Sequence, residues 1–187
     1  MSMFCYQCQE TAKGTGCTIA GVCGKKENTA NLQDLLVFAL KGIAVVAVEA
    51  QKQGKLDNTT GLFICQSLFA TITNANFDDS RITALIKEAF AKRDALKLTT
   101  AFTGTQDCVA WNGSEAEFAA KAQEVGVLSQ PNEDVRSLRE LLIYGLKGMA
   151  AYTEHAAMLG FEKPEIYEYM IAALASTTQD LTVDEMI

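Results

Sequence analysis

The chain has 187 residues, which suits one large domain or two small ones, and 49% of them are hydrophobic, enough for a proper core. A formal charge of −7 argues against a nucleic-acid partner, because phosphate binding requires a clustered excess of Lys and Arg. The opening MSMFCYQCQE lacks the basic start and apolar run of a secretory signal, so we expect a cytoplasmic protein.

Residues 1–27 are predicted to form a loop-rich segment that binds a cofactor. They contain four cysteines in the pattern C-x2-C-x8-C-x5-C, with glycines between them. The stretch has no apolar period, so burial alone would not order it, whereas four thiolates around a metal centre would. The glycines allow positive φ angles and let backbone N–H groups approach sulfur. The predicted ligands are Cys5, Cys8, Cys17 and Cys23.

The spacing of these cysteines leaves three kinds of centre open. Tetrahedral zinc is one, although zinc ribbons usually carry two C-x2-C knuckles, and the second pair here is C-x5-C. An iron–sulfur cluster is larger and accepts more varied spacing. Two disulfides are the third alternative, and a cytosolic setting disfavours them.

Helical periodicity dominates from Asn28 onward and predicts a first bundle over residues 28–100. Its first helix should open at the cap-type residues Asn28 and Thr29, close at Gly54, and lie buried at the centre. The most apolar stretch within it is interrupted by Lys41 and is shorter than the roughly 20 apolar residues that span a bilayer, so no membrane contact is expected. Two further helices are predicted, one over about 60–73 and one after residues 78–80.

The second half, residues 101–187, is predicted to repeat the first. Residues 32–50 align without gaps on residues 138–156, with 8 of 19 positions identical. Both copies contain Leu-Lys-Gly, and a glycine inside a helix costs about 1 kcal/mol relative to alanine. Its recurrence at Gly42 and Gly148 suggests a close helix approach in both copies. The fold class expected is therefore all-α, with two three-helix-bundle-like halves related by an internal repeat; chance resemblance of two amphipathic helices is the alternative.

Local signals divide this second half into helices. Ser114 to Glu117 forms a capping box, Asn132 is a cap, and a helix is expected from Pro164 to Ser176. A second capping box, Thr182 to Glu185, opens a helix only one turn before Ile187. Because one turn is not stable alone, we expect the chain to be a fragment; a ragged natural C-terminus is the alternative.

Several other residues favour structural roles over chemistry. Cys65 is expected to be a buried core residue, Cys108 a structural residue in a connecting segment, and Trp111 a core anchor or interface residue. His155, the single histidine, has no metal-binding partner one turn away on its helix and is expected at a surface or interface. One histidine also offers no nucleophile–base pair, so no catalytic residue is assigned.

Two lysines, Lys25 and Lys26, follow the last cysteine. We interpret them as a solvated pair. The alternatives are a docking point for an acidic redox partner and compensation of a cluster's negative charge.

The segment MFCYQCQETAKGTGCTIAGVCGK, with the helix TANLQDLLVFALKGIAVVA after it, closely resembles the N-terminus of hybrid-cluster proteins, also called prismane proteins or hydroxylamine reductases. The resemblance continues through RSLRELLIYGLKGMAAYTEHAAMLG. It implies that the four cysteines hold the proximal cluster, a [4Fe–4S] cluster by their short spacing, whereas longer-spaced relatives carry [2Fe–2S]. It also implies a hybrid cluster held by later domains that are absent here.

The resulting expectation is an electron-transfer module. It would take electrons from an external donor and pass them to the remaining domains of a parent oxidoreductase that reduces hydroxylamine or nitric oxide. The alternative from another class is a zinc-stabilised helical interaction module without redox chemistry. A third possibility is that the helices mainly provide an assembly surface.

Overall fold

The computed structural model describes residues 3–187, so residues 1 and 2 of the predicted cysteine segment lie outside the described residues. Helices dominate the fold, and the only β-type pairing within residues 3–187 is an isolated bridge between Cys5 and Cys17. The predicted all-α class, with a cysteine-rich N-terminal segment, is confirmed. The α-helices are α1 Glu27–Lys52, α2 Asn58–Ala70, α3 Asp79–Thr100, α4 Asp107–Ala110, α5 Phe118–Val125, α6 Glu133–Met158, α7 Pro164–Ser176 and α8 Val183–Met186.

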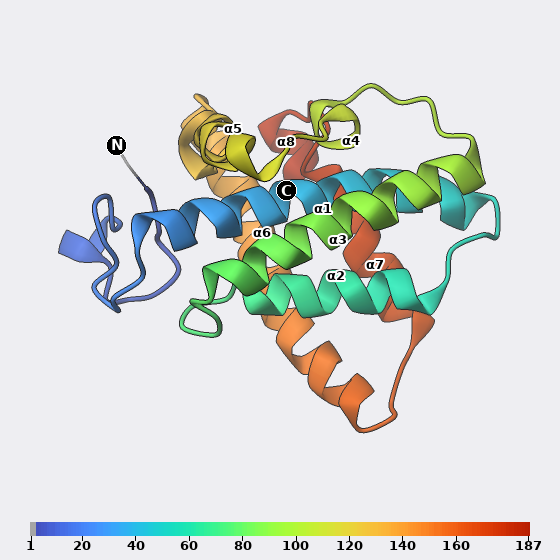
Figure 1. Ribbon diagram of the computed structural model, residues 1–187, viewed down its shortest axis with the longest axis horizontal. Helices are drawn as coiled ribbons and strands as arrows, with labels where there is room; N and C mark the ends of the chain where they lie inside the picture. The colour runs from blue at the N-terminus through green and yellow to red at the C-terminus, as the bar shows by residue number, and fades with distance from the viewer. Residues whose placement is uncertain (1–2) are drawn as a thin grey trace.

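Helix α1 is the centre of the molecule, as predicted. Helix α1 packs along α3 and also contacts α5 and α7. Helix α6 runs across the direction of α1 and α3 (Figure 1). Its Leu35, Leu40 and Ile43 are completely buried, because helices surround α1 on most of its circumference. The cysteine segment forms a lobe at one end, beyond the start of α1 (Figure 1).

Helix α1 is also long and apolar enough to cross a membrane by length and composition, contrary to the sequence-based argument that it falls short. However, 72% of the qualifying window is buried inside the protein. The hydrophobicity of α1 is therefore accounted for by its position as the core helix.

Most helix ends follow their local sequence signals. Gly54 adopts a positive φ of 64° just after α1, and the side chain of Asn132 accepts hydrogen bonds from the first turn of α6. The start of α1 was predicted incorrectly. Lys26 is the N-cap, while Asn28 and Thr29 lie inside the helix and donate side-chain hydrogen bonds to Asp79 at the start of α3.

The internal repeat is not confirmed. Helices α1 and α6 both form, but α6 buries few side chains, and it leaves Leu141 and Tyr152 exposed at 67% and 82%. Gly42 does mark a close approach, since a Cβ there would lie 2.1 Å from the carbonyl oxygen of Cys108. The same expectation is wrong for Gly148, where a Cβ would meet nothing within 4 Å.

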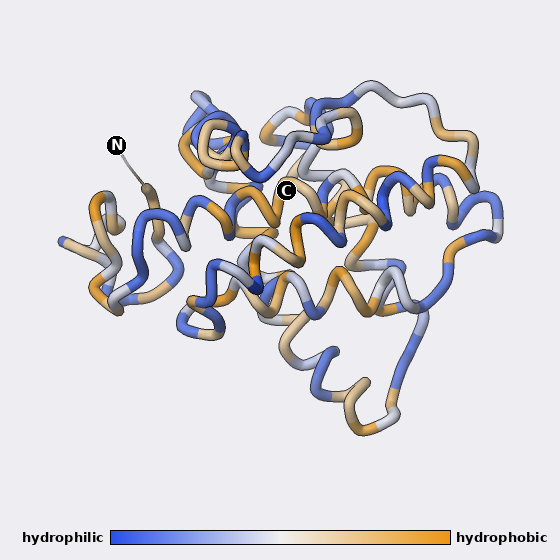
Figure 2. Tube along the Cα trace, viewed as in Figure 1, coloured by the Kyte–Doolittle hydropathy of each residue, from blue (hydrophilic) through white to orange (hydrophobic). Residues whose placement is uncertain are grey.

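One hydrophobic core joins helices from both predicted halves. Buried side chains from α1, α2 and α3 share this cluster with side chains from α6 and α7, and α2 packs mainly against α6 and α7. Figure 2 shows that hydrophobic residues recur along the helices, whereas the connection from α1 to α2 is largely hydrophilic. The division at residue 100 stays a prediction.

Candidate metal centre

The cysteine segment is held by a backbone pairing between two of its cysteines. The N–H of Cys5 donates to the carbonyl of Cys17 at 3.0 Å, and the N–H of Cys17 donates back to the carbonyl of Cys5 at 2.8 Å. In such an antiparallel pair, the two side chains emerge on the same face. This pairing brings the first and third predicted ligands together.

The loop between the paired cysteines turns back toward sulfur. The backbone N–H of Ala12 points at Sγ of Cys17, 3.5 Å away, and the short helical turn Ala12–Gly14 includes Lys13 at φ 59°. Cys17 is buried and forms a small cluster with Met3 and Ala30, separate from the main core. The segment therefore has only a minor hydrophobic core of its own, in agreement with its lack of an apolar period.

The other two cysteines are placed differently. Cys8 is half-buried, and Cys23 is exposed within the turn formed by residues 21–25. Within residues 3–187, no group of three or more His, Cys, Asp or Glu side chains is arranged to hold a metal ion. The structure therefore pairs the backbones of Cys5 and Cys17 by hydrogen bonds, but it does not bring all four cysteines together. The full ligand set stays a prediction.

The donor chemistry nevertheless fits a sulfur-ligated centre. All six cysteines of the chain are free thiols, and four of them lie in this one segment. One sulfur already accepts a backbone N–H, the kind of contact that tunes iron–sulfur clusters. Cys5, Cys8, Cys17 and Cys23 are the residues that would hold such a group.

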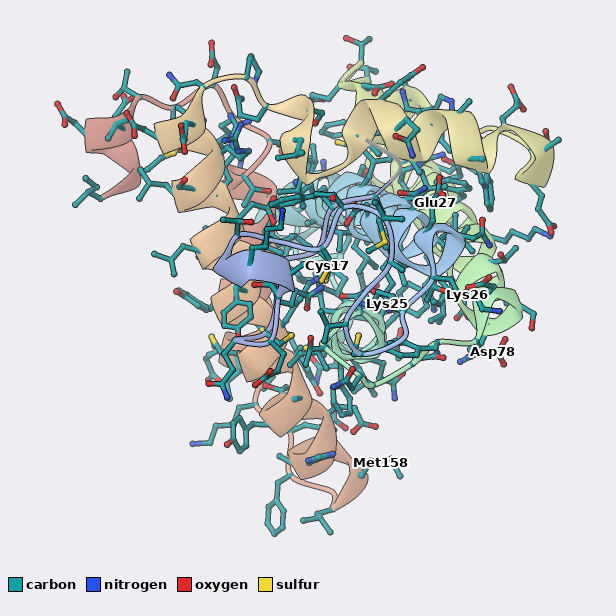
Figure 3. All side chains as sticks on the ribbon, turned by 90° about the vertical axis from the view of Figure 1, so that its left-hand side faces the viewer. Cys17, Lys25, Lys26, Glu27, Asp78 and Met158 are labelled. Atoms are coloured by element: carbon teal, nitrogen blue, oxygen red, sulfur yellow. The ribbon has the colours of Figure 1, made fainter. Side chains whose placement is uncertain are left out.

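The two lysines after the last cysteine differ in their exposure to solvent. Lys26 is exposed, but Lys25 is only 1% exposed, so the interpretation as a solvated pair is wrong for Lys25. A hydrogen bond from the N–H of Gly21 to the carbonyl of Lys25, at 2.8 Å, closes the turn and directs this side chain inward. Figure 3 shows Lys25 near Cys17 in the middle of this face, and Lys26 toward its edge.

A tyrosine next to Cys5 fastens the segment to the second half of the chain. The hydroxyl of Tyr6 donates to Oε2 of Glu140 on α6, at 2.8 Å. Burial, and after it the neighbouring Glu140 carboxylate, raise the pKa of Tyr6 well above its usual range. The hydroxyl therefore keeps its proton and remains a donor to Glu140.

Near the contact of Tyr6 with Glu140, Asp34 of α1 and Lys147 of α6 interact electrostatically. Burial raises the pKa of Asp34 to about 7, although the cation of Lys147 opposes that rise. Burial also lowers the pKa of Lys147 to about 8, and the nearby Asp34 limits the fall. Lys41 faces the same group, and burial lowers its pKa as well. Burial thus disfavours the charged form of each of these groups, and the opposite charges nearby partly counteract that effect.

A cavity of about 30 Å³ lies between these charges and the segment, and its lining includes Cys5, Tyr6, Asp34, Glu140 and Lys147. It is polar and has room for about one or two water molecules. Sequence reasoning missed this polar cluster. The available signal was that each apolar helix carries an acid and a lysine at aligned positions, Asp34 with Glu140 and Lys41 with Lys147.

The remaining candidates take structural positions. Cys65 is fully buried with Sγ 3.4 Å from Sδ of Met170, and burial raises the pKa of its thiol to about 12. Cys108 is buried too, which raises its pKa. Trp111 packs edge-on against Phe90, whereas His155 is exposed. The predictions that Cys65 is a buried core residue and that His155 lies at the surface are confirmed. Trp111 packs against the core, as one of its two predicted roles requires. The structural role of Cys108 stays a prediction.

Comparison with known proteins assigns the fold and its cysteine segment to a family. The sequence profile described as Prismane/CO dehydrogenase family matches residues 3–186. The chain belongs to this family. The predicted resemblance is thereby confirmed, and proteins of this family bind iron–sulfur clusters.

Curated relatives support the same assignment over the whole chain. A hydroxylamine reductase of Nitratidesulfovibrio vulgaris is 56% identical over 198 aligned residues, covering 99% of this chain and 35% of the relative. Hydroxylamine reductases of Desulfitobacterium hafniense and Bacteroides thetaiotaomicron are 53% and 52% identical, covering 100% of this chain and 36% and 35% of their own lengths. The chain therefore spans about a third of the length of these relatives.

Proposed function

We propose that this chain is the electron-entry part of a hydroxylamine reductase, with Cys5, Cys8, Cys17 and Cys23 holding a [4Fe–4S] cluster. When bound, such a cluster supplies a one-electron carrier. The observation that carries the proposal is the reciprocal backbone pairing of Cys5 and Cys17. It sets two sulfur donors on one face of a segment with little core of its own.

The surroundings of the cysteines support this role. The N–H of Ala12 and the ammonium of Lys25 both point at sulfur, and each would stabilise negative charge on a ligated cysteine. The contact between Tyr6 and Glu140 orients the segment against α6, so that a bound cluster would have a fixed place relative to the helices.

We propose two partners, an electron donor and the remaining domains of the parent chain. An external electron donor would approach the lobe at the end of the molecule, where Cys23 is exposed. The remaining domains of the parent chain, with their hybrid cluster, would receive the electrons and carry out the reduction. We place the protein in the cytoplasm, without nucleic-acid or membrane contacts. This chain supplies no catalytic residue.

Anaerobic reconstitution of the full chain with iron and sulfide tests the proposal. We expect about four iron atoms per chain, visible absorbance that dithionite bleaches, and an EPR signal from the reduced sample. Cys8→Ser should lower the iron content sharply, whereas Cys65→Ser, in the core, serves as the matched control and should keep it.

One result would contradict the proposed function, and another would contradict only the cluster type. A colourless protein that binds one zinc and no iron would favour the zinc-stabilised module. About two iron atoms per chain, with the optical and EPR signature of a two-iron centre, would replace [4Fe–4S] by [2Fe–2S] and retain the electron-transfer role.

A further inference from the structure

The side chain of Lys25 is buried against a predicted cluster ligand. Its Nζ lies 3.8 Å from Sγ of Cys5 and 2.7 Å from Oε1 of Gln33 on α1. The ammonium also lies over the ring of Phe77, 5.7 Å from its centroid. Three parts of the chain therefore enclose this one cation.

The position of Lys25 is fixed from both ends. Gln33 is itself buried, and its Nε2 donates to the carbonyl of Asn76 at 3.0 Å, which holds the amide oxygen toward Lys25. At the backbone, a Cβ on Gly21 would lie 3.0 Å from Cβ of Lys25 and 3.1 Å from Sγ of Cys23. A side chain at Gly21 would therefore force Lys25 or Cys23 to shift.

A cation buried in this way needs a negative partner. Lysine is almost never fully buried unless it is paired, because removing an ammonium from water is costly. Among residues 3–187, no carboxylate forms a salt bridge with Lys25, and its hydrogen-bond acceptors are an amide oxygen and a cysteine sulfur. The carboxylate of Asp34 also acts on Lys25, but without a salt bridge between them. A ligated Cys5 would therefore be the negative group in direct contact with the ammonium.

We infer that Lys25 is a positioning residue for the cluster, a fixed positive charge that stabilises the Cys5 thiolate and favours the reduced, more negative form of the centre. The inference rests on the proposed function, since it requires Cys5 to be a ligand. A positive charge and an N–H···S contact beside a ligand both raise the reduction potential of such a centre.

A redox titration monitored by EPR tests this on the anaerobically reconstituted full chain, with dithionite as reductant. Lys25→Met should shift the midpoint potential downward. Lys25→Arg, which keeps the charge, should stay near the wild type. Lys26→Met is the matched control, since it removes an exposed charge one residue away, and it should leave the midpoint unchanged.

Iron content separates the two possible failures. If the wild type binds no iron, the proposed function fails and this inference fails with it. If the wild type binds iron, and Lys25→Met has both the wild-type midpoint and the wild-type iron content, only the role of Lys25 is overturned.

A variant that does not assemble is also decisive. If Lys25→Met keeps its helical circular dichroism but loses iron, retention of iron by Lys25→Arg supports the role of the charge. Loss of iron from both variants overturns that role.

Discussion

Two glycines that occupy identical Leu-Lys-Gly motifs have opposite environments. Gly42 packs against the backbone of α4 at Cys108, whereas the position of Gly148 is open. The motif shows that glycine recurs in both helices. The neighbour that requires glycine at position 42 is the backbone of Cys108, which lies far away in the sequence. Sequence reasoning therefore gave one right and one wrong prediction from the same three letters.

The two positions make a matched pair for mutation. Gly42→Ala should lower the free energy of unfolding by about 1–3 kcal/mol, because the new methyl group would collide with a backbone carbonyl that cannot rotate away. Gly148→Ala should raise it by up to about 1 kcal/mol, since alanine is the better helix former. Urea unfolding of both variants measures the difference, and equal effects would contradict the assigned environments.

The half-buried Asp34 should make the free energy of unfolding depend on pH. Its pKa is about 7 in the folded protein against an ordinary value of 3.8, so the folded state keeps a proton that the unfolded chain releases. The resulting stabilisation is complete below about pH 4 and is lost as the pH rises through 7, by up to about 1.4 kcal/mol per pH unit. The groups that face this carboxyl are Tyr6, Lys25, Lys41, Glu140 and Lys147.

Asp34→Asn should remove that slope. Chemical unfolding at several pH values between 4 and 7 measures it, and an unchanged slope would rule out Asp34 as the source. Asp57→Asn is the control, because the pKa of Asp57 is shifted in the opposite direction, downward. Hydrogen bonds, first from the N–H of Thr60, lower the pKa of Asp57, so its stabilisation is lost only as the pH falls further into the acid range.

At the scale of elements, the predicted helix starts came close where the signal was local: α2 begins at Asn58 and α3 at Asp79, rather than near residue 60 and after residue 80. The caps at Asp57, Asp78 and Asn132 and the glycine at Gly54 act within one turn of the helix that they bound. The start of α1 was missed because tertiary structure redirected its cap-type residues: Thr29 bonds to Asp79 on α3, 50 positions away. Propensity predicts a cap but cannot show that a distant carboxylate competes for it.

Asn132 is the clearest local cap. Its Oδ1 accepts hydrogen bonds from the N–H groups of Asp134 and Val135, at 3.0 and 3.1 Å. Asn132→Ala should therefore lower the free energy of unfolding by about 1 kcal/mol. Lys163→Ala is the control, since the side chain of Lys163 makes no capping hydrogen bond at the start of α7, and it should change stability by less than about 0.5 kcal/mol. Thermal or urea denaturation that ranks the two variants the other way would refute the capping role.

At the scale of the whole molecule, hydrophobic residues gather at the far end of α6 and in the connection after it. Tyr152, Met158, Leu159 and Phe161 are all at least 74% exposed. Met158 lies at the lower end of α6, away from the cysteine segment (Figure 3). Exposed apolar patches of this kind mark surfaces that associate. In the parent protein proposed above, the remaining domains would cover this surface.

The isolated chain should therefore self-associate. Its apparent size in gel filtration should rise with concentration, and the double variant Tyr152→Glu, Phe161→Glu should elute at a constant, smaller size. Leu98→Glu is the control, because Leu98 is 86% exposed on α3 and lies apart from this group. A wild-type chain that elutes as a monomer at every concentration would contradict the prediction.

The candidate site could be predicted from sequence only where its residues are neighbours in the chain. The four cysteines were recognisable because they fall within one short segment. The cluster of Tyr6, Asp34, Glu140 and Lys147 was not, because its members come from distant parts of the chain: Tyr6 and Glu140 alone are 134 positions apart. Each alone resembles an ordinary surface side chain. These side chains form one cluster only because folding packs the cysteine segment against α1 and α6, and the sequence does not show that packing.

The bond between Tyr6 and Glu140 has a practical consequence for anyone who wishes to transplant the cysteine segment onto another scaffold. A graft of residues 1–27 alone would leave the phenol without its acceptor, and adding α1 would not supply it. The smallest portable unit reaches as far as α6, so the segment is portable only together with much of the helical body to which it is fastened.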